Sequence, residues 1–562
     1  MLPEERLTAC IAVSFILVYL SSFLVFAFRL PVASYGSILA ICAAVSAWAW
    51  RDLVALLKSP EVKRLLLGLG LLAVWVVALL TLIRNYSGDN WYGDWLEHYQ
   101  RSLYFLDHPD SPAALQGGYA LAARPPLMNV VCACFMAVAG RDYPVYQLLA
   151  ALLSLLIYLP VCLLARRFSA GGRFHTWFVA AFLMLNPLVV QNVTYGWTKM
   201  LAAFYVLTGI YFYVQGWREK RSPSMFLAIA CLSAGIVTHY SAGPYALFLA
   251  GHLLLVVLPS RKPDWRSLSA AVVASLVVLG SWFAYSVSAF GKGTVTSTTS
   301  YFEAAGFTAV QNLSKIAGNI FDTLVPSLLR GVEVQGFGPR LFWGPLRDAA
   351  FRLYQFNLVF GLGCLGAILL VLGLLGARKR TPVNDRAERT FWLLLAVCCL
   401  VVGIAVQGER YTLGLVHITL QPLVLIGLAF LAGRFGEWSA GLKWLAWTGL
   451  LLDALFGIAI HFWFQSLTFV EPSPAGWGIT SRDLLVGSVR ANWRLKQDHG
   501  LTYLGDLVWP YAGIFAGVAL VMGAGILVLL AREAGSVRTA VKAEVVPTGG
   551  GSRRRRRRKL HR

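Results

Sequence analysis

The chain has 562 residues, 57% of them hydrophobic and 14% charged, with a mean hydropathy of +0.64. This composition excludes an ordinary soluble protein, in which about a quarter of the residues are charged. The formal net charge of +22 does not point to a nucleic-acid partner, because 532–562 alone carries 11 basic and 2 acidic residues, or +9, and its Arg553–Arg558 run lacks aromatic residues that stack on bases. We predict that 532–562 is a disordered cytoplasmic tail on anionic lipid headgroups.

Apolar runs of about 20 residues, long enough to cross a hydrocarbon core, recur along the rest of the chain. They predict an all-α polytopic membrane protein with a transmembrane domain over 1–531 and membrane lipids as its surroundings. The fourteen runs lie at roughly 8–29, 32–50, 64–83, 145–165, 176–190, 197–215, 224–240, 244–260, 267–288, 356–377, 390–407, 412–433, 441–463 and 510–531.

Lys and Arg gather in alternate loops, which places those loops and both termini in the cytoplasm. The alternation holds only if the 13-residue apolar stretch 127–139 does not span, and we predict that it is a helix lying at the outer membrane surface. Three long segments then lie outside: 84–144, 289–355 and 464–508. Bulky outer segments on a helical bundle indicate chemistry at the outer face.

The first outer segment contains Asp94, Glu97, His98 and Arg101, at the spacing i, i+3, i+4 and i+7. A helix would place all four on one face. A plainer interpretation is that Asp94 and Glu97 form a capping box at a helix start. That alternative does not explain the presence of His98 and Arg101 on the same face.

A second feature of this segment is Ala-Arg-Pro-Pro-Leu at 123–127. An arginine fixed beside a rigid Pro-Pro can bind a phosphate through two parallel hydrogen bonds. Four more polar residues are predicted at outer ends of spans: Lys199, His239, Tyr240 and Arg410. The alternatives are that Lys199 and Arg410 only extend to the membrane interface and that His239 only hydrogen-bonds at a helix end. Asp453, inside a span, is predicted to be paired for structural reasons.

These motifs resemble the GT-C membrane glycosyltransferases, and in particular the protein O-mannosyltransferase-like group, glycosyltransferase family 39, which includes the aminoarabinose transferases. The resemblance extends over most of 64–435. It departs at Tyr-Gly-Trp-Thr-Lys (195–199), where many relatives carry a second acid, and in the two spans before residue 60. It rests on GDWLEHY (93–99), RPPL (124–127), AGRD (139–142), LLARRF (163–168), LNPL (185–188) and ERY (409–411).

The resemblance implies a GT-C type bundle that transfers a hexose or pentose from a polyprenyl-phosphate donor to a lipid, glycan or protein, with inversion. It implies Asp94 as the catalytic base with Glu97 as a second carboxylate, and a donor phosphate among Arg124, Lys199 and Arg410. The substrate pocket would include His98, Arg101, His239 and Tyr240. No definite cofactor is implied, and a divalent metal is allowed. The location implied is the bacterial cytoplasmic (inner) membrane, with the site on the periplasmic face.

Two other classes of protein remain open from the residues. A polyprenyl-linked polysaccharide polymerase or ligase would depend mainly on basic residues of the late outer segment, 464–508, rather than on Asp94. A multi-span transporter or lipid flippase would have matching halves and a lined cavity at the membrane midplane.

Overall fold

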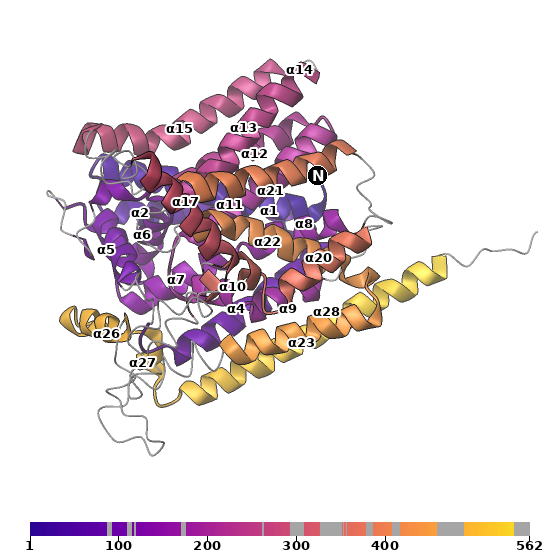
Figure 1. Cartoon of the computed structure of the whole chain (residues 1–562). Helices are drawn as coiled ribbons and strands as arrows, with labels where there is room; N and C mark the ends of the chain where they lie inside the picture. The colour runs from indigo at the N-terminus through magenta and orange to yellow at the C-terminus, as the bar shows by residue number, and fades with distance from the viewer. Residues whose placement is uncertain are drawn as a thin grey trace, which may run out of the picture.

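The computed structural model is a bundle of helices (Figure 1). The structure describes the chain except for residues 87–92, 110–114, 117–119, 170–175, 261–263, 293–307, 326–350, 352, 356, 378–385, 407–415, 458–487 and 545–562. Within the described ranges every regular element is helical. This confirms the predicted all-α class.

The described parts of all fourteen predicted runs lie mainly on helices. Nine helices of the described chain are long and apolar enough to cross a membrane, or eleven if two bent pairs each count as one span. The nine contain α1 (Pro3–Ala27), α4 (Pro60–Leu82), α7 with α8 (Tyr143–Leu155, Tyr158–Phe168), α11 (Lys199–Arg218), the stretch Tyr240–Ser260 with α13 (Gly243–His252), α15 (Trp265–Phe290), α21 (Arg386–Val406), α22 (Val416–Arg434) and α28 (Ala512–Glu544). Shorter apolar helices are α12 (Ser222–Thr238), α20 (Gly366–Ala377) and α23 (Ala440–Phe456).

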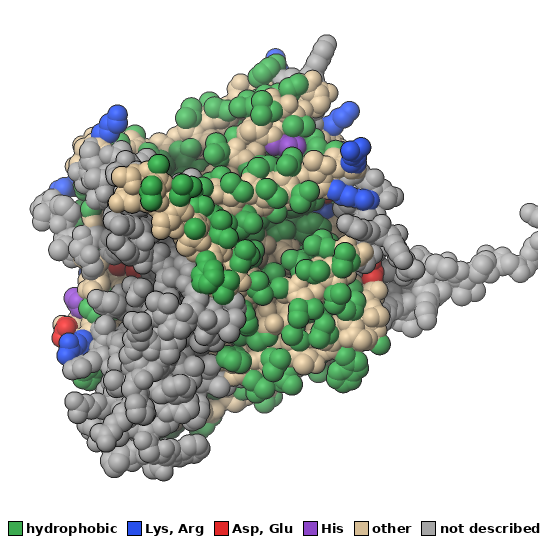
Figure 2. Space-filling model, viewed as in Figure 1, with side chains coloured by type: hydrophobic (Ala, Val, Ile, Leu, Met, Phe, Trp, Pro, Cys, Tyr) green, Lys and Arg blue, Asp and Glu red, His purple; other side chains and the backbone are tan. Residues whose placement is uncertain are grey.

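On the face shown in Figure 2, hydrophobic side chains cover the middle of the bundle, and described Lys and Arg side chains lie toward its ends. Several of these large apolar side chains are widely exposed, such as Leu255 at 80% and Val521 at 73%. Such a surface is unfavourable in water but fits a hydrocarbon environment. The chain is therefore an integral, multi-pass membrane protein.

One of the two bent pairs positions a site residue. Helix α9 (Thr176–Leu185) meets α10 (Pro187–Thr194) at 73°. Pro187 lacks an N–H and cannot continue the preceding helix, while the side chain of Asn186 accepts a hydrogen bond from Val189 N at 3.1 Å and caps the new one. The chain then turns through 195–198 into α11, whose first residue is Lys199.

The short helix α6 has the predicted bounds, Leu127–Ala139. Its residues from Leu127 to Cys134 are fully buried, because α1, α2 (Ala33–Trp48), α5 (Asp94–Asp107) and α7 pack around it. Protein rather than lipid therefore covers most of this helix. The length of α6 predicted that it does not span. Its burial results from the packing of the other helices, including the N-terminal pair α1 and α2.

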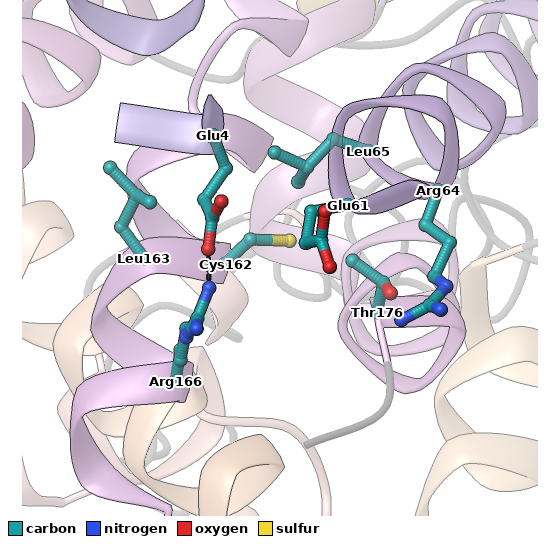
Figure 3. A pocket seen from close by; sticks show the side chains of 8 residues that line it. All are labelled: Glu4, Glu61, Arg64, Leu65, Cys162, Leu163, Arg166 and Thr176. Atoms are coloured by element: carbon teal, nitrogen blue, oxygen red, sulfur yellow. Dashed lines mark ion pairs between the residues drawn. The ribbon is translucent and has the colours of Figure 1, made fainter. Parts of the chain in front are cut away.

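The two ends of the bundle differ in their chemistry. Helix α1 ends beside α5, where the rings of Phe26 and Phe105 lie 4.8 Å apart. It begins roughly 33 Å away, at a polar cavity of about 180 Å³ that includes the ion pair between Glu4 and Arg166 (Figure 3). Glu61 and Arg64, on the first turns of α4, line the same cavity. The predicted site residues that the structure describes lie at the α5 end.

Candidate active site

Helix α5 starts at Asp94, and the residue that caps it is Gly93. Gly93 has φ = 87°, a left-handed conformation that other residues rarely adopt. Since Asp94 is already inside the helix and no side chain caps this end, the capping-box interpretation is wrong. Asp94 instead directs Oδ1 toward Arg124 Nη2, at 3.2 Å. Its carboxylate still lies at the positive end of the helix dipole.

The four residues of the i, i+3, i+4, i+7 face are all buried, with exposures of 7% for Asp94, 0% for Glu97, 2% for His98 and 1% for Arg101. Arg101 uses its whole guanidinium within the protein: Nε donates to Glu97 Oε1 at 2.7 Å, Nη1 to Leu121 O at 2.7 Å and Nη2 to Ala120 O at 2.9 Å. These bonds fix the segment that leads to Arg124. The contacts of Arg101 hold the site together, and its place in the substrate pocket stays a prediction.

Arg124 stands where the sequence predicted a phosphate-binding arginine. It follows a short 3-10 turn (Leu121–Ala123) and is extended, with φ = −134° and ψ = 138°, as a residue before proline prefers. Its Nη1 lies 2.8 Å from Glu97 Oε2 and its Nη2 3.2 Å from Asp94 Oδ1. With 21% of its side chain exposed, it is less enclosed than Glu97.

The two carboxylates of this face differ in their burial and in the number of guanidinium groups that they contact. Glu97 is fully buried and contacts one guanidinium through each oxygen, that of Arg101 and that of Arg124. Asp94 contacts only Arg124 in the ion pairs of the described residues, and it is the more exposed of the two acids. Asp94 is therefore the less enclosed of the two carboxylates and has the fewer guanidinium contacts.

His98 faces Arg124 through Nε2, which lies 3.2 Å from Arg124 Nη1. A guanidinium only donates hydrogen bonds, so Nε2 must accept and the proton of the neutral ring lies on Nδ1. Burial, together with the positive charges of Arg124 and Arg101, holds the pKa of His98 well below its usual value of 6.5. His98 is therefore neutral in the folded protein.

The pKa of His98 predicts how stability changes with pH. Below about pH 6.5 the unfolded chain binds a proton at His98 that the folded chain does not, so the free energy of unfolding falls as pH falls, by up to about 1.4 kcal/mol per pH unit. His98→Gln removes this contribution. Melting temperatures of the purified protein between pH 7.5 and 5 should decline less steeply in the variant. Parallel curves for the two proteins would contradict the prediction.

Three residues from other spans complete the cluster. The ammonium of Lys199 lies 3.7 Å from the centre of the Trp197 ring and interacts electrostatically with Asp94 and Arg124. It is only 6% exposed, so it does not extend into the membrane interface. His239 interacts with the charges of Lys199 and Arg124, and Tyr240 with that of Arg101.

His239 also has a local structural role. It follows α12 in an extended conformation, and its Nδ1 accepts a hydrogen bond from Ser241 N at 3.1 Å. This is the helix-end bond that the plainer interpretation predicted. Because Nδ1 accepts, the neutral ring carries its proton on Nε2, and His239 combines this bond with its place near the cluster.

The structure thus brings together all the predicted site residues that lie in its described part: those of α5, Arg124, Lys199, His239 and Tyr240. Arg410 lies outside the described residues. Asp453 is elsewhere, on α23, where Oδ1 accepts a hydrogen bond from Cys364 N at 2.8 Å, as expected for a structurally paired acid. In formal charge, Arg101, Arg124 and Lys199 contribute +3 and Asp94 and Glu97 contribute −2, so the cluster carries +1.

Sequence reasoning missed two asparagines of this region. Asn129 of α6 donates to His98 O at 2.7 Å and joins α6 to α5. Asn492 of α26 (Ser488–Asp498) contacts both neighbours of Asp94. A polar residue inside the apolar run 127–139 was a usable signal for Asn129, whereas no local pattern singled out Asn492.

The residues of the cluster do not fit a bound metal. Within the described residues there is no group of three or more His, Cys, Asp or Glu side chains placed to hold a metal ion. The oxygens of Glu97 face guanidinium groups, and the ring nitrogen of His98 that accepts also faces Arg124.

The fold and this cluster define a class: a multi-pass helical membrane protein with a buried ionic centre at one end of its bundle. No protein-family model matches the sequence, and no curated protein matches it. Among solved structures, the chain is similar to ArnT from Cupriavidus metallidurans bound to undecaprenyl phosphate, with 18% identity, a TM-score of 0.45, and coverage of 87% of this chain and 80% of that one.

Two further solved structures are similar to the chain. ArnT from the same organism in the apo state has 16% identity and a TM-score of 0.36, with coverage of 80% of this chain and 91% of that one. The archaeal oligosaccharyltransferase AglB from Archaeoglobus fulgidus, in complex with an inhibitory peptide and a dolichol-phosphate, has 15% identity and a TM-score of 0.36. It is matched over 71% of this chain and 55% of its own length.

Proposed function

We propose that the chain is a membrane glycosyltransferase that moves a sugar, a hexose or pentose, from a polyprenyl-phosphate donor to an acceptor. The observation that carries the proposal is the buried cluster of Asp94, Arg124 and Lys199 at the end of membrane spans. A carboxylate beside two cations is what transfer from a phosphate leaving group requires. Two of the solved structures named above, ArnT bound to undecaprenyl phosphate and AglB in complex with a dolichol-phosphate, hold lipid phosphates of the same chemical class as this donor.

The proposed reaction uses each group once. Asp94 accepts the proton of the acceptor nucleophile as that atom bonds to the anomeric carbon. The bond between the anomeric carbon and the phosphate oxygen breaks, and its electron pair leaves with the phosphate. Arg124 and Lys199 stabilise the charge that develops there. Attack opposite to the leaving group inverts the configuration.

The charge of the cluster suits this reaction throughout its course. The donor is a phosphodiester with one negative charge, which balances the +1 of the cluster. After transfer Asp94 is protonated, so the cluster carries +2, and the polyprenyl phosphate released from the sugar carries −2. The sum is zero before and after transfer. A buried site with an uncompensated charge would be costly, so this balance favours the proposed chemistry.

An apolar cavity supports a lipid-linked donor. It measures about 460 Å³ and lies between α1, α4, α6 and α7, with Phe15, Leu69, Phe135 and Leu152 among its lining residues. Phe135 is eight residues into α6, roughly 12 Å from the start of the helix that follows Arg124. A cavity of this size, lined by apolar side chains, can hold part of an isoprenoid chain.

The proposed function is tested with the purified protein in lipid nanodiscs and a panel of polyprenyl-phosphate hexoses and pentoses. We expect one donor to bind and to release polyprenyl phosphate when lipid, glycan or peptide acceptors are added. If no member of the panel is bound or consumed, the proposal fails.

A polymerase or ligase is not favoured by the contacts of the late segment, where the basic residue Lys496 is engaged with Asp506 and with Arg84 O.

We further propose that the cluster faces the outside of the cytoplasmic membrane, with both termini inside. Ala139, at the exposed end of α6, and Lys58, at the exposed end of α3 (Trp50–Lys58), then lie on opposite sides. In a protein without native cysteines, Ala139→Cys should react with a membrane-impermeant maleimide in intact cells and Lys58→Cys only after lysis. The reverse pattern would show that the cluster faces the cytoplasm and would contradict this proposal.

A further inference from the structure

Helix α26 belongs to the late outer segment, far along the chain from α5, yet it packs against the start of α5. Asn492, Leu495 and Lys496 are spaced i, i+3 and i+4, so they share one face of α26. That face lies against the start of α5, since a side chain built on Gly93 would come within 3.0 Å of Leu495 Cδ1. Lys496 anchors the same helix by donating to Arg84 O at 2.8 Å.

Asn492 makes three hydrogen bonds around Asp94. Its Oδ1 accepts from Gly93 N at 3.0 Å and from Trp95 Nε1 at 2.7 Å, the residues immediately before and after Asp94. Its Nδ2 donates to Tyr86 O at 3.0 Å. Asn492 is completely buried, so none of these bonds is exchanged with water at the surface.

We propose that Asn492 is a positioning residue: its carboxamide fixes the orientation of the Asp94 carboxylate for proton transfer. Gly93 lets the backbone take its left-handed turn, but a glycine cannot by itself hold that conformation. Asn492 Oδ1 accepts hydrogen bonds from both neighbours of Asp94 and so restricts the backbone at Gly93 to this conformation. The inference rests on the proposed function, because it assigns Asn492 a part in the same transfer step.

The surroundings of Trp95 support this role. Its ring lies against Tyr143 at 4.9 Å and Tyr503 at 5.2 Å between centroids, and it is fully buried. The indole N–H therefore points to one place, Asn492 Oδ1. A misplacement of about 1 Å in a reacting group can reduce a rate by about 100-fold.

The test compares Asn492→Ala with Arg494→Ala, a change of an exposed residue on the same helix. Asn492→Ala should lower the turnover number about 10- to 100-fold while the KM for the donor and the affinity for polyprenyl phosphate stay unchanged, because Arg124 and Lys199 are intact. Arg494→Ala should match the wild-type protein. Wild-type turnover in Asn492→Ala, or a loss of donor binding equal to its loss of turnover, would overturn the proposal.

A double variant separates positioning from a general structural role. If Asn492 acts through Asp94, then Asn492→Ala added to Asp94→Asn leaves the residual rate of Asp94→Asn unchanged. A further loss in the double variant would refute the assignment. If Asn492→Ala does not fold, Trp95→Phe decides, since it keeps an aromatic ring at this position, leaves Asn492 in place and removes the indole N–H together with part of the ring. A folded Trp95→Phe with reduced turnover supports the role, and one with wild-type turnover overturns it. An inactive wild-type protein would instead count against the proposed function.

Discussion

Asp94→Asn should abolish nearly all sugar transfer while the protein folds, inserts and binds its donor. General-base contributions are typically about 100- to 10,000-fold, or roughly 3–5 kcal/mol of barrier, and asparagine keeps the shape of aspartate but cannot accept the proton. Since Asp94 does not cap α5, the substitution removes no helix cap. It also raises the formal charge of the cluster from +1 to +2, so the affinity for polyprenyl phosphate should stay the same or increase.

Single-turnover transfer and lipid binding are measured on the same preparation. Asp107→Asn is the matched control, because Asp107 ends the same helix and is exposed, with 42% of its side chain accessible. It should transfer at the wild-type rate. Wild-type turnover in Asp94→Asn would refute Asp94 as the base. Glu97→Gln would then be the next variant, although it leaves Arg101 and Arg124 without their shared carboxylate and should destabilise the fold.

Arg124→Ala should weaken the binding of polyprenyl phosphate about 10- to 150-fold. This range corresponds to the roughly 1.5–3 kcal/mol of a hydrogen bond to a charged group, at about 1.4 kcal/mol for each factor of ten. Arg124→Lys should lose less, because it keeps the charge and loses the planar pair of donors. The alanine variant also lowers the formal charge of the cluster from +1 to 0, which acts in the same direction.

Binding is measured by titrating purified protein with polyprenyl phosphate, in which no sugar contacts contribute. Arg141→Ala is the matched control, since Arg141 lies in the same segment of the chain, 84–144, and 60% of its side chain is exposed. Its affinity should equal that of the wild type. Equal affinity in the wild-type, Arg124→Lys and Arg124→Ala proteins would remove the phosphate-binding role of Arg124.

The sequence by itself determined the helical class, the apolar helices and the end of the bundle at which the described polar residues gather, although only nine to eleven of the fourteen predicted spans are long enough to cross a membrane within the described residues. These properties depend on local hydrophobicity and length, which a membrane makes unusually informative because every backbone group must be bonded within its own helix. The 3.6-residue period also placed Asp94, Glu97, His98 and Arg101 on one face of α5, and the proline pair placed Arg124 in an extended conformation.

Only the tertiary structure decided how these residues share their hydrogen bonds. The guanidinium of Arg101 is held by the carbonyls of Ala120 and Leu121, which accept its hydrogen bonds. Glu97 was distinguished from Asp94 by the approach of two guanidinium groups. Asn492 lies 399 positions from Gly93, and nothing in the local sequence of either predicts their contact. A periodic pattern specifies which face a residue occupies, but its partner across that face depends on how distant helices pack.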